Sequence, residues 1–349
     1  MENLVETYKG KRILVTGHTG FKGSYLRLWL KQMGAEVDGF GLPPHTNPNH
    51  FEVTGGTRLD WVNAIGGPRD LRQLNSLMYH MEDKPEIVFH LAAQAIVKES
   101  FRDPQETFSS NIMGAVNVLE ACRNTPSVKA IVVITSDKVY QDQNWGWAYR
   151  EVDPLGGTDP YSASKVCVEQ IAASYRESFN MNIATARAGN VIGGGDWAAY
   201  RLIPDVMRAT VEGKPVEIHT PHATRPYQHV LEALHGYLRL GEALLEGREE
   251  CKTAFNFGPD GSMSVLEVLE IAKKVWPKIQ YVVKEEETHP GMVSLLKIDS
   301  TKAKQMLGWR PNWTMEHAIR RTVLWCRSFY EDGVVLSHKD IEAFEGVWT

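Results

Sequence analysis

"ILVTGHTGFKGSYLRLWL", residues 13–30, runs from an apolar strand directly into a helical pattern. Between the two, Gly17, Gly20 and Gly23 have the spacing G-x-x-G-x-x-G. Glycines at such a turn let the backbone approach a pyrophosphate closely, and the helix that follows offers amide donors at the positive end of its dipole. An ordinary strand–helix turn also tolerates glycines, but the strand before and the helix after favour a dinucleotide-binding loop.

The alternation of strand and helix continues through the first half of the chain. Apolar segments typical of strands lie at 12–15, 36–40, 86–91, 129–135 and 182–186, with helical patterns at 21–33, 70–81, 104–123 and 161–179. Repeated strand–helix units predict an α/β fold, a Rossmann-type doubly wound parallel sheet with helices on both faces. Chemistry in such folds lies at the carboxyl ends of the strands.

The second half is less regular and predicts a smaller, mixed α/β substrate domain. Strands are expected at 216–218, 253–257 and 279–283, and helices at 202–212, 229–246, 264–275 and 314–330. We place the main boundary at Gly189, so that residues 1–189 form the dinucleotide-binding domain and residues 190–349 mainly the substrate domain. The segment around 228–255 is expected to rejoin the first domain.

The composition excludes several classes of protein. The 349 residues are 43% hydrophobic, enough for a large core or two domains, and the net charge of -5 offers no basic surface for nucleic acid or a membrane. No apolar run approaches the ~20 residues that span a bilayer, and the start lacks the apolar core of a signal peptide. The cysteines are far apart, as expected for reduced thiols of a cytoplasmic protein. Neither they nor the twelve histidines show a metal-ligand spacing, so we expect no metal.

A second motif, "DPYSASK" at 159–165, places Tyr161 and Lys165 four residues apart at the start of a helix, hence on one face. A tyrosine acts as a general base only if the pKa of its phenol falls toward neutrality, and a neighbouring ammonium group favours the phenolate. A bare pair of this kind would more often be a surface tyrosine and lysine. Behind a glycine loop of this spacing, it predicts a catalytic pair.

A third motif, "TSDK" at 135–138, closes the predicted strand 129–135. Ser136, Asp137 and Lys138 are therefore expected at a carboxyl strand end, where an acid and a base could face a substrate. The alternative is an ion pair in a solvated turn, worth ~0–1 kcal/mol. A lysine with an ordinary pKa of ~10.4 is a poor base at neutral pH, so a catalytic Lys138 requires burial or nearby cations.

These motifs resemble those of the extended short-chain dehydrogenase/reductases that act on nucleotide sugars. The matching strings are TGHTGFKG (16–23), FHLAAQ (89–94), SNIMG (110–114), TSDK (135–138) and the Tyr161–Lys165 pair. Longer strings are similar to the CDP-glucose 4,6-dehydratase branch: YREVDPLGGTDPYSASK (149–165), ARAGNVIGGGDW (186–197), RLIPD (201–205) and RPYQHVLEAL (225–234). The resemblance covers most of the chain and thins after about residue 285.

The resemblance implies an NAD-dependent dehydration within one site. Tyr161 would take the proton of the sugar's 4-hydroxyl as hydride leaves carbon 4 for NAD, while Lys165 holds the nicotinamide ribose and Ser136 the 4-oxygen. Asp137 would protonate the departing 6-hydroxyl, and Lys138, as the base of the CDP-glucose branch, would remove the proton on carbon 5. Hydride return to carbon 6 would give a 4-keto-6-deoxy sugar and recycle the tightly bound NAD.

The resemblance also implies which residues bind the two ligands. The cofactor would contact Gly17, Gly20, Phe21, Gly23, Leu91, Ala92, Ala93, Asn111, Tyr161 and Lys165. The nucleotide sugar would contact Gln94, Asn190, Asp196, Trp197, Arg201 and Arg225. Outside their strings, Asn190 and Arg225 would be a turn residue and a surface cation, and Trp197 could equally belong to the core. Trp145 and Trp147 would flank the sugar or a subunit contact, with simple packing as an equal alternative, and His90 is expected to be structural.

Three departures from the family pattern leave specificity open. The acid that usually ends the second strand is missing, since Gly41 takes its place and Asp38 falls inside the strand, so this feature does not settle NAD versus NADP. Gly67-Pro68 replaces an Asp–hydrophobic pair near the adenine, and proline removes a backbone donor. Gly291-Met292 replaces a His–Glu pair near the substrate, so the nucleotide and sugar could differ from CDP-glucose.

Three functions stay in competition. The leading one is dehydration of CDP-glucose, or the same chemistry on another nucleotide sugar. A nucleotide-sugar 4-epimerase would share the Tyr–Lys–NAD core but has no use for the Asp137–Lys138 pair. A non-catalytic NAD-binding protein on the same fold is kept open by the altered adenine motif, but the intact Ser136, Tyr161 and Lys165 argue against it. Family members associate through two long helices, here about 104–123 and 161–179, so we expect a homodimer or homotetramer.

Overall fold

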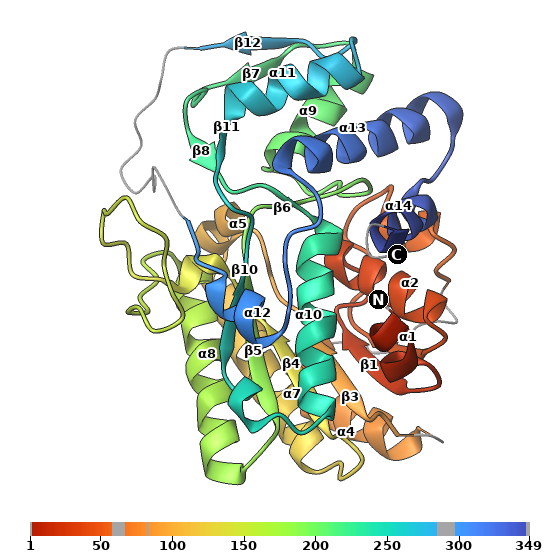
Figure 1. Ribbon diagram of the computed structural model, residues 1–349, viewed down its shortest axis with the longest axis vertical. Coiled ribbons are helices and arrows are strands. Elements are labelled where there is room, and N and C mark those ends of the chain that lie inside the picture. The colour runs from red at the N-terminus through yellow and green to blue at the C-terminus, as the bar shows by residue number, and fades with distance from the viewer. Residues whose placement is uncertain (1, 58–66, 82–83, 285–296, 347–349) are drawn as a thin grey trace.

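The computed structural model describes residues 2–57, 67–81, 84–284 and 297–346, and its centre is a six-stranded parallel sheet (Figure 1). The strands are β1 (Arg12–Thr16), β2 (Glu36–Phe40), β3 (Ile87–His90), β4 (Ala130–Ile134), β5 (Ile183–Ala188) and β10 (Ala254–Phe257), in the order β10–β5–β4–β3–β1–β2. The predicted doubly wound sheet is confirmed. The strand order reverses between β1 and β3, so the carboxyl ends of these strands form the switch point at which α/β folds bind ligands.

Alternate residues of each strand point to opposite faces of the sheet, and each face carries its own layer of helices. Ile13 and Val15 of β1 pack into one buried cluster, whereas Leu14 between them packs into another. The first cluster includes side chains of α1 (Glu2–Tyr8), α2 (Phe21–Gln32) and α10 (Val230–Leu245). The second includes side chains of α4 (Leu71–His80), α7 (Gly114–Arg123) and α8 (Pro160–Phe179).

A second, smaller group of elements with its own core lies at one end of the sheet (Figure 1). It contains α9 (Leu202–Val211), β7 (Val216–Ile218), β8 (Thr224–Arg225), β11 (Met263–Ser264), α11 (Val265–Val275), β12 (Tyr281–Val283) and α13 (Met315–Asp332). β7 pairs with β12 in parallel, and β8 pairs with β11 in an antiparallel manner. α11 begins with a capping box between Ser264 and Glu267, which satisfies its first amides.

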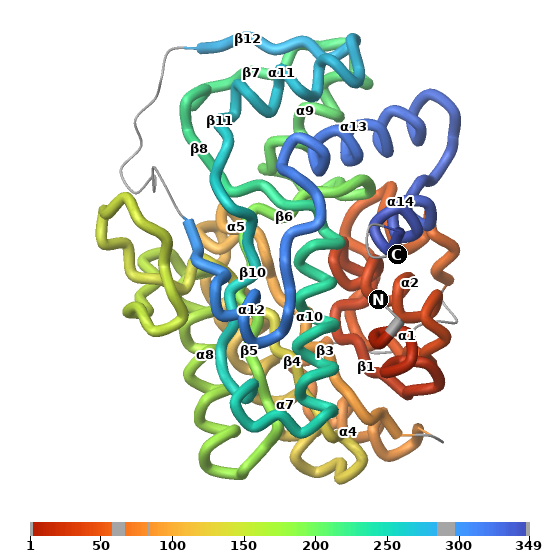
Figure 2. Tube along the Cα trace, in the orientation of Figure 1, coloured from red at the N-terminus to blue at the C-terminus, as the bar shows by residue number. Residues whose placement is uncertain are grey.

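The chain leaves the sheet after β5 and later returns to it. β6 (Val191–Ile192) pairs with β9 (Gln228–His229). α10 then packs against one face of the sheet, and β10 joins the sheet as an edge strand beside β5. α12 (Thr301–Met306) follows, and α14 (Ser337–Glu345) lies against α2 (Figure 2). There the ring of Trp29 meets Phe344 edge-on at 5.5 Å, and its Nε1 donates to Glu345 at 2.7 Å. The C-terminal helix therefore braces the helix that follows the glycine loop.

The main difference from the sequence prediction is in the segment 104–123, which is not one regular helix. It contains α6 (Pro104–Phe108), the π-helical segment η3 (Ser109–Met113) and α7. The short elements α3 (His50–Val53), α5 (Val97–Arg102), η2 (Gly67–Arg69), η4 (Asp137–Val139) and η5 (Glu249–Cys251) were also not expected. Segments this short do not show a hydrophobic period. Within the described residues, no helix is long and apolar enough to cross a membrane.

Candidate functional site

The glycine loop between β1 and α2 has two positions that accept no side chain. Gly17 has a φ of +73°, and a Cβ there would lie 2.7 Å from the amide nitrogen of Ala92. A Cβ on Gly23 would lie 2.1 Å from the carbonyl oxygen of Gly17. Gly20 is the N-cap of α2 and has no side chain to bond the first amides of the helix. The loop is therefore a cradle that fits the pyrophosphate of a dinucleotide.

The end of β2 next to this cradle carries no carboxylate. Asp38, inside the strand, forms an ion pair with Arg12 at 3.2 Å. Gly41 follows the strand, and a Cβ there would lie 3.3 Å from the backbone of Gly17. Thr19 of the glycine loop donates to the carbonyl oxygen of Leu42 at 2.7 Å, which holds the two segments together. The close approach explains the glycine, and it occurs where the family usually places an acid.

The loop after β3 is fastened to β1 beside the cradle. The amide of Leu91 donates to the carbonyl oxygen of Thr16 at 3.1 Å, and the amide of Ala92 donates to its Oγ1 at 3.3 Å. Ala92 and Ala93 are both half-buried, and the backbone of Ala92 lies close to Gly17. On the other side of the cradle, Phe21 begins α2, and its ring packs edge-on against Tyr25 of the same helix.

Asn111 and Gln94 tie this loop to the helices beside it. The Asn111 side chain accepts from the Gln94 amide at 2.8 Å and donates to the Gln94 carbonyl oxygen and to Ser164 Oγ. The Gln94 side chain donates to Thr107 Oγ1 at 2.8 Å and bonds the backbone of Ile96. Both amides are engaged within the protein. Contacts of Asn111 with a cofactor and of Gln94 with a substrate stay predictions.

The turn after β4 presents a buried carboxylate and an exposed ammonium group. Ser136 caps η4, because its Oγ accepts from the Lys138 amide at 3.2 Å, and it donates to Asp137 Oδ1 at 3.0 Å. Asp137 is only 4% exposed, whereas Lys138 is exposed. Gly189, directly after β5, faces the buried carboxylate, since a Cβ there would lie 1.8 Å from Asp137 Oδ2. The turn thus differs from an ion pair that is solvated on both sides, and the roles of Asp137 and Lys138 stay predictions.

Tyr161 and Lys165 of α8 are both buried next to this turn. Burial raises the pKa of Tyr161 to about 12, although a hydrogen bond with Ser136 opposes the rise. The Nζ of Lys165 donates to the carbonyl oxygen of Ile134, the last residue of β4, at 3.1 Å. Burial, and then the charge of Lys22, lower the pKa of Lys165 to about 8. The structure thus brings Ser136, Tyr161 and Lys165 together.

Lys22, the second residue of α2, is a residue near the site to which the sequence analysis gave no role. Burial and then the charge of Arg201 lower its pKa to about 8, while Asp137 and Asp196 oppose this change. The pKa of Lys22 therefore responds to charges on both the turn after β4 and the segment that contains Arg201. Its position within a motif expected to hold phosphates was the available signal.

The segment after β6 contains three predicted substrate contacts, and two of them pair with each other. Asp196 and Arg201 form an ion pair at 2.8 Å. The Nε1 of Trp197 donates to the hydroxyl of Tyr330 at 2.7 Å, and its ring meets Trp325 edge-on at 5.7 Å. Trp197 therefore packs against the second core, which was the alternative left open by the sequence.

Asn190 lies on the connection between β5 and β6, whereas Arg225 belongs to β8 of the second group. Asn190 has a left-handed φ of +48°, and its carbonyl oxygen accepts from the Gln228 amide at 3.2 Å. Arg225 ends β8, and its Nη1 donates to the carbonyl oxygen of Thr224 at 2.8 Å. Their roles toward a nucleotide stay predictions. The Gly291-Met292 departure lies outside the described residues.

The sequence also singled out His90, Trp145 and Trp147, and the structure gives the surroundings of each. His90 bonds Thr16 Oγ1 at 2.7 Å, and burial, together with the charge of Lys165, lowers its pKa to about 3, so that the ring is neutral. Trp145 stacks on Trp147 with ring centres 4.8 Å apart. Trp147 is 64% exposed, so its outer face is free to meet a sugar or another subunit.

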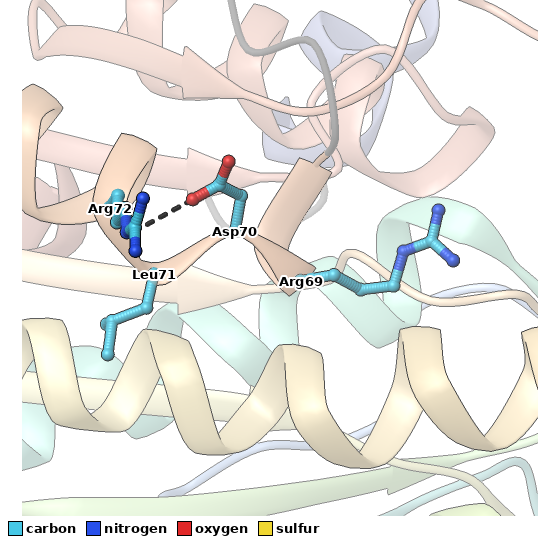
Figure 3. Close-up of a pocket in the computed structure, with 4 residues that line it drawn as sticks. All are labelled: Arg69, Asp70, Leu71 and Arg72. Atoms are coloured by element: carbon cyan, nitrogen blue, oxygen red, sulfur yellow. Dashed lines mark hydrogen bonds between the residues drawn. The ribbon is translucent and has the colours of Figure 1, made fainter.

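The Gly67-Pro68 departure forms the start of η2, where Gly67 has a φ of +62° and the Pro68 carbonyl oxygen accepts from Asn117 at 3.1 Å. Asp70 caps α4 by accepting from the amide of Arg72 at 2.9 Å (Figure 3). A surface pocket is lined here by Arg69, Asp70, Leu71 and Arg72. It contains none of the predicted catalytic residues, which lie in the turn after β4 and on α8.

The chain is similar to known proteins in both sequence and fold. Residues 14–322 match the family model described as GDP-mannose 4,6 dehydratase. The chain is 41% identical to a CDP-glucose 4,6-dehydratase of Salmonella typhimurium, covering 98% of each chain. It is 28% identical to a UDP-glucose 4-epimerase of Mycolicibacterium smegmatis, covering 91% of this chain and 99% of the relative. The crystal structure of a Thermus thermophilus UDP-glucose 4-epimerase in complex with NAD has a TM-score of 0.76 at 25% identity, covering 93% of this chain and 100% of that one.

Proposed function

Because the chain belongs to the GDP-mannose 4,6 dehydratase family, we propose that it is a hydro-lyase that converts CDP-glucose to CDP-4-keto-6-deoxyglucose. The observation that carries the proposal is the buried Asp137 beside Ser136 and Tyr161. We assign Ser136, Tyr161 and Lys165 to oxidation at carbon 4. We assign Asp137 and Lys138 to elimination across carbons 5 and 6. CDP-glucose as the substrate is supported by the 41% identity with the Salmonella typhimurium relative over nearly the whole of both chains.

The cofactor that we propose is NAD, held by the cradle of Gly17, Gly20 and Gly23. Support comes from the close backbone approaches at Gly17 and Gly23 and from the NAD complex of the Thermus thermophilus neighbour. Bound NAD supplies a hydride acceptor that is regenerated in each turnover. Lys165, one helical turn after Tyr161, is placed to hold the nicotinamide ribose.

Oxidation requires that Tyr161 take a proton from the sugar's 4-hydroxyl. In the protein alone burial holds the pKa of its phenol at about 12, so a nearby positive charge is needed to favour the phenolate. We assign this role to Lys165, which is buried one turn further along α8. Ser136 already hydrogen-bonds the phenol, and a 4-hydroxyl bound between the two would be oriented by both.

Elimination requires an acid at the departing 6-hydroxyl and a base at the proton on carbon 5. We assign the acid to Asp137, whose carboxyl is fixed by Ser136 and by the space left at Gly189. We assign the base to Lys138. Since Lys138 is exposed in the chain alone, we infer that the bound sugar displaces water from its ammonium group before it acts. The protonated 6-hydroxyl leaves as water, and hydride then returns to carbon 6. The complete reaction therefore causes no net oxidation.

We also propose how the chain is divided, how it assembles and where it acts. The NAD-binding domain is 1–189 rejoined by about 228–255, supported by the packing of α10 and β10 in the sheet. A homodimer or homotetramer would form through the α6–α7 segment and α8, where Phe108, Met113 and Phe179 are exposed. Free cysteines at 122, 167, 251 and 326 support a cytoplasmic location.

A direct assay tests the proposed reaction. Purified protein is incubated with CDP-glucose and NAD, and the product is examined by mass spectrometry and by the alkali-dependent absorbance of a 4-keto sugar. We expect a product that is lighter by one water, with no net reduction of NAD. Formation of CDP-galactose would indicate an epimerase. NAD binding without turnover of any nucleotide sugar would contradict the proposal.

A further inference from the structure

Glu169 is a buried carboxylate that the proposed reaction does not use. It lies on α8 four residues after Lys165 and eight after Tyr161, so the three side chains share one face of the helix. Its side chain is only 5% exposed. A carboxylate is costly to bury unless its oxygens are bonded, and the partners of Glu169 show what it holds.

Lys165 and Glu169 bond consecutive residues where β4 ends. Lys165 Nζ donates to the carbonyl oxygen of Ile134 at 3.1 Å, and Thr135 Oγ1 donates to Glu169 Oε1 at 2.5 Å. Ser136 is the next residue of the chain and begins the catalytic turn. Because a hydrogen bond to a buried carboxylate is stronger than one between neutral groups, this contact fixes the point at which the turn starts.

Arg187 on β5 connects the same carboxylate to the far side of the turn. Its Nε and Nη2 donate to the two oxygens of Glu169 at 2.9 and 3.0 Å, a bidentate pair with both side chains at most 5% exposed. Its Nη1 donates to the hydroxyl of Tyr140 at 2.9 Å. Tyr140 in turn donates to Asn256 Oδ1 of β10 at 2.7 Å. The ion pair therefore holds Thr135, directly before the N-cap Ser136 of η4, and Tyr140, the C-cap of η4.

We propose that Glu169 and Arg187 are positioning residues, which hold the Ser136–Lys138 turn and the Lys165 ammonium in the geometry required for both half-reactions. The inference rests on the proposed function, since it assumes that this turn carries out the elimination. Neither residue is assigned a contact with substrate or cofactor. Their effect acts through Thr135, Tyr140 and Lys165.

Besides its hydrogen bonds to Thr135 and Arg187, Glu169 acts on Lys165 through its negative charge. Its carboxylate favours the ammonium form of Lys165, whereas burial and the charge of Lys22 favour the neutral form. The titratable groups around Lys165 are Lys22 on α2, His90 on β3, and Tyr161 and Glu169 on α8. His90 is neutral, so Glu169 is the group that opposes Lys22. Loss of its charge should make Lys165 release its proton at lower pH.

Two matched substitutions separate positioning from ordinary stability. Thr135 and Thr185 both donate to Glu169, at 2.5 and 2.7 Å, but only Thr135 adjoins the catalytic turn. Thr135→Val should lower kcat about tenfold or more with KM little changed, because a displaced turn misaligns the reacting groups. Thr185→Val should leave kcat within about twofold, and Thr135→Ser, which keeps the hydroxyl, should restore activity. An equal loss in both valine variants would overturn the proposal.

A titration of Lys165 in the absence of substrate tests the proposed effect of the Glu169 charge. The protein is labelled with 13Cε-lysine, the Lys165 signal is assigned from its loss in Lys165→Arg, and its midpoint is followed with pH. Glu169→Gln should lower that midpoint by about one pH unit or more. If this variant does not fold because Arg187 is left unpaired, Glu169→Gln combined with Arg187→Met removes both buried charges. The midpoint should then shift in the same direction but by less, because loss of the Arg187 cation acts with the opposite sign.

The two tests also distinguish failure of the inference from failure of the proposed function. An unchanged Lys165 midpoint would overturn the role of Glu169 whatever the substrate proves to be. If the midpoint shifts but the protein does not dehydrate CDP-glucose, the proposed reaction is wrong, whereas the effect of Glu169 on Lys165 holds. The kinetic comparison of the valine variants can then be repeated on any nucleotide sugar that the wild-type protein turns over.

Discussion

The carboxylate of Asp137 occupies the space that a side chain at position 189 would need. A Cβ on Gly189 would lie 1.8 Å from Asp137 Oδ2 and 2.5 Å from Oδ1. Gly189 follows β5 directly, and Asp137 follows β4 by three residues, so two neighbouring strand ends set this contact. The absence of a side chain on one strand end therefore determines where the acid on the other can lie.

Substitution of Gly189 should damage elimination more than oxidation. Gly189→Ala forces Asp137 to move away from the departing hydroxyl, and a displacement of this kind can cost about 10²-fold in rate. We expect rapid formation of the reduced cofactor on mixing with substrate, followed by slow release of product. Stopped-flow absorbance follows the first step, and product analysis follows the second.

A matched control for this substitution is Gly146→Ala, because a Cβ on Gly146 meets nothing within 4 Å. It should behave as the wild type. If Gly189→Ala also leaves the rate of product release unchanged, the assignment of Asp137 as the acid is wrong.

The pH dependence of oxidation should report Lys165. Its pKa of about 8 means that the ammonium group is present below that pH and is lost above it. Since the charge favours the phenolate of Tyr161, kcat/KM for the oxidation step should fall on the alkaline side of about pH 8. Lys22→Met removes a repelling cation, so the pKa of Lys165 should rise and the fall should move to higher pH. A profile that moves to lower pH, or does not move, would contradict the arrangement of these two lysines.

The glycine loop should tolerate a methyl group at one position and not at another. A Cβ on Gly23 would lie 2.1 Å from a backbone oxygen, whereas a Cβ on Gly20 would lie 3.3 Å from the same atom. Gly23→Ala should therefore lose NAD binding, measured by calorimetry, and Gly20→Ala should retain more of it. Thermal unfolding of both variants shows whether the loss is local. Equal NAD affinities for the two variants would contradict the steric argument.

Lys138 should be required for the exchange of one hydrogen. With Lys138→Ala, carbon 4 can still be oxidised by the Tyr161 side of the site, but the proton on carbon 5 has no base. We expect the exchange of this proton with deuterated solvent to disappear, as followed by NMR of the sugar. Undiminished exchange would exclude Lys138 as the base.

The sequence predicted the fold because the fold depends on local signals. The glycine loop has a recognisable spacing, and the buried strands are short apolar runs separated by helical periods, so β1 to β5 and α2 were placed correctly. Ser136, Tyr161 and Lys165 were predicted as catalytic groups for a similar reason, since each lies at a strand end or on one helix face. Their roles stay predictions.

What the sequence did not reveal depends on contacts between distant segments. The pairing of Glu169 with Arg187 joins a helix to the following strand, and nothing in the spacing of the two residues specifies it. The steric need for Gly189 arises only when β4 and β5 lie side by side. The π-helical segment Ser109–Met113 interrupts a helix whose hydrophobic period gave no sign of it. Lys22 stood inside a quoted motif, but its relation to Lys165 required the fold.

The most direct test of the central claim follows one hydrogen through the reaction. CDP-glucose carrying deuterium at carbon 4 is converted in ordinary water, and the product is analysed by NMR and mass spectrometry. The account predicts a 4-keto-6-deoxy sugar with the deuterium at carbon 6 and a solvent hydrogen at carbon 5, because the same hydride leaves carbon 4 and returns to carbon 6. Deuterium found again at carbon 4, in a product that has lost no water, would show an epimerase and contradict the account.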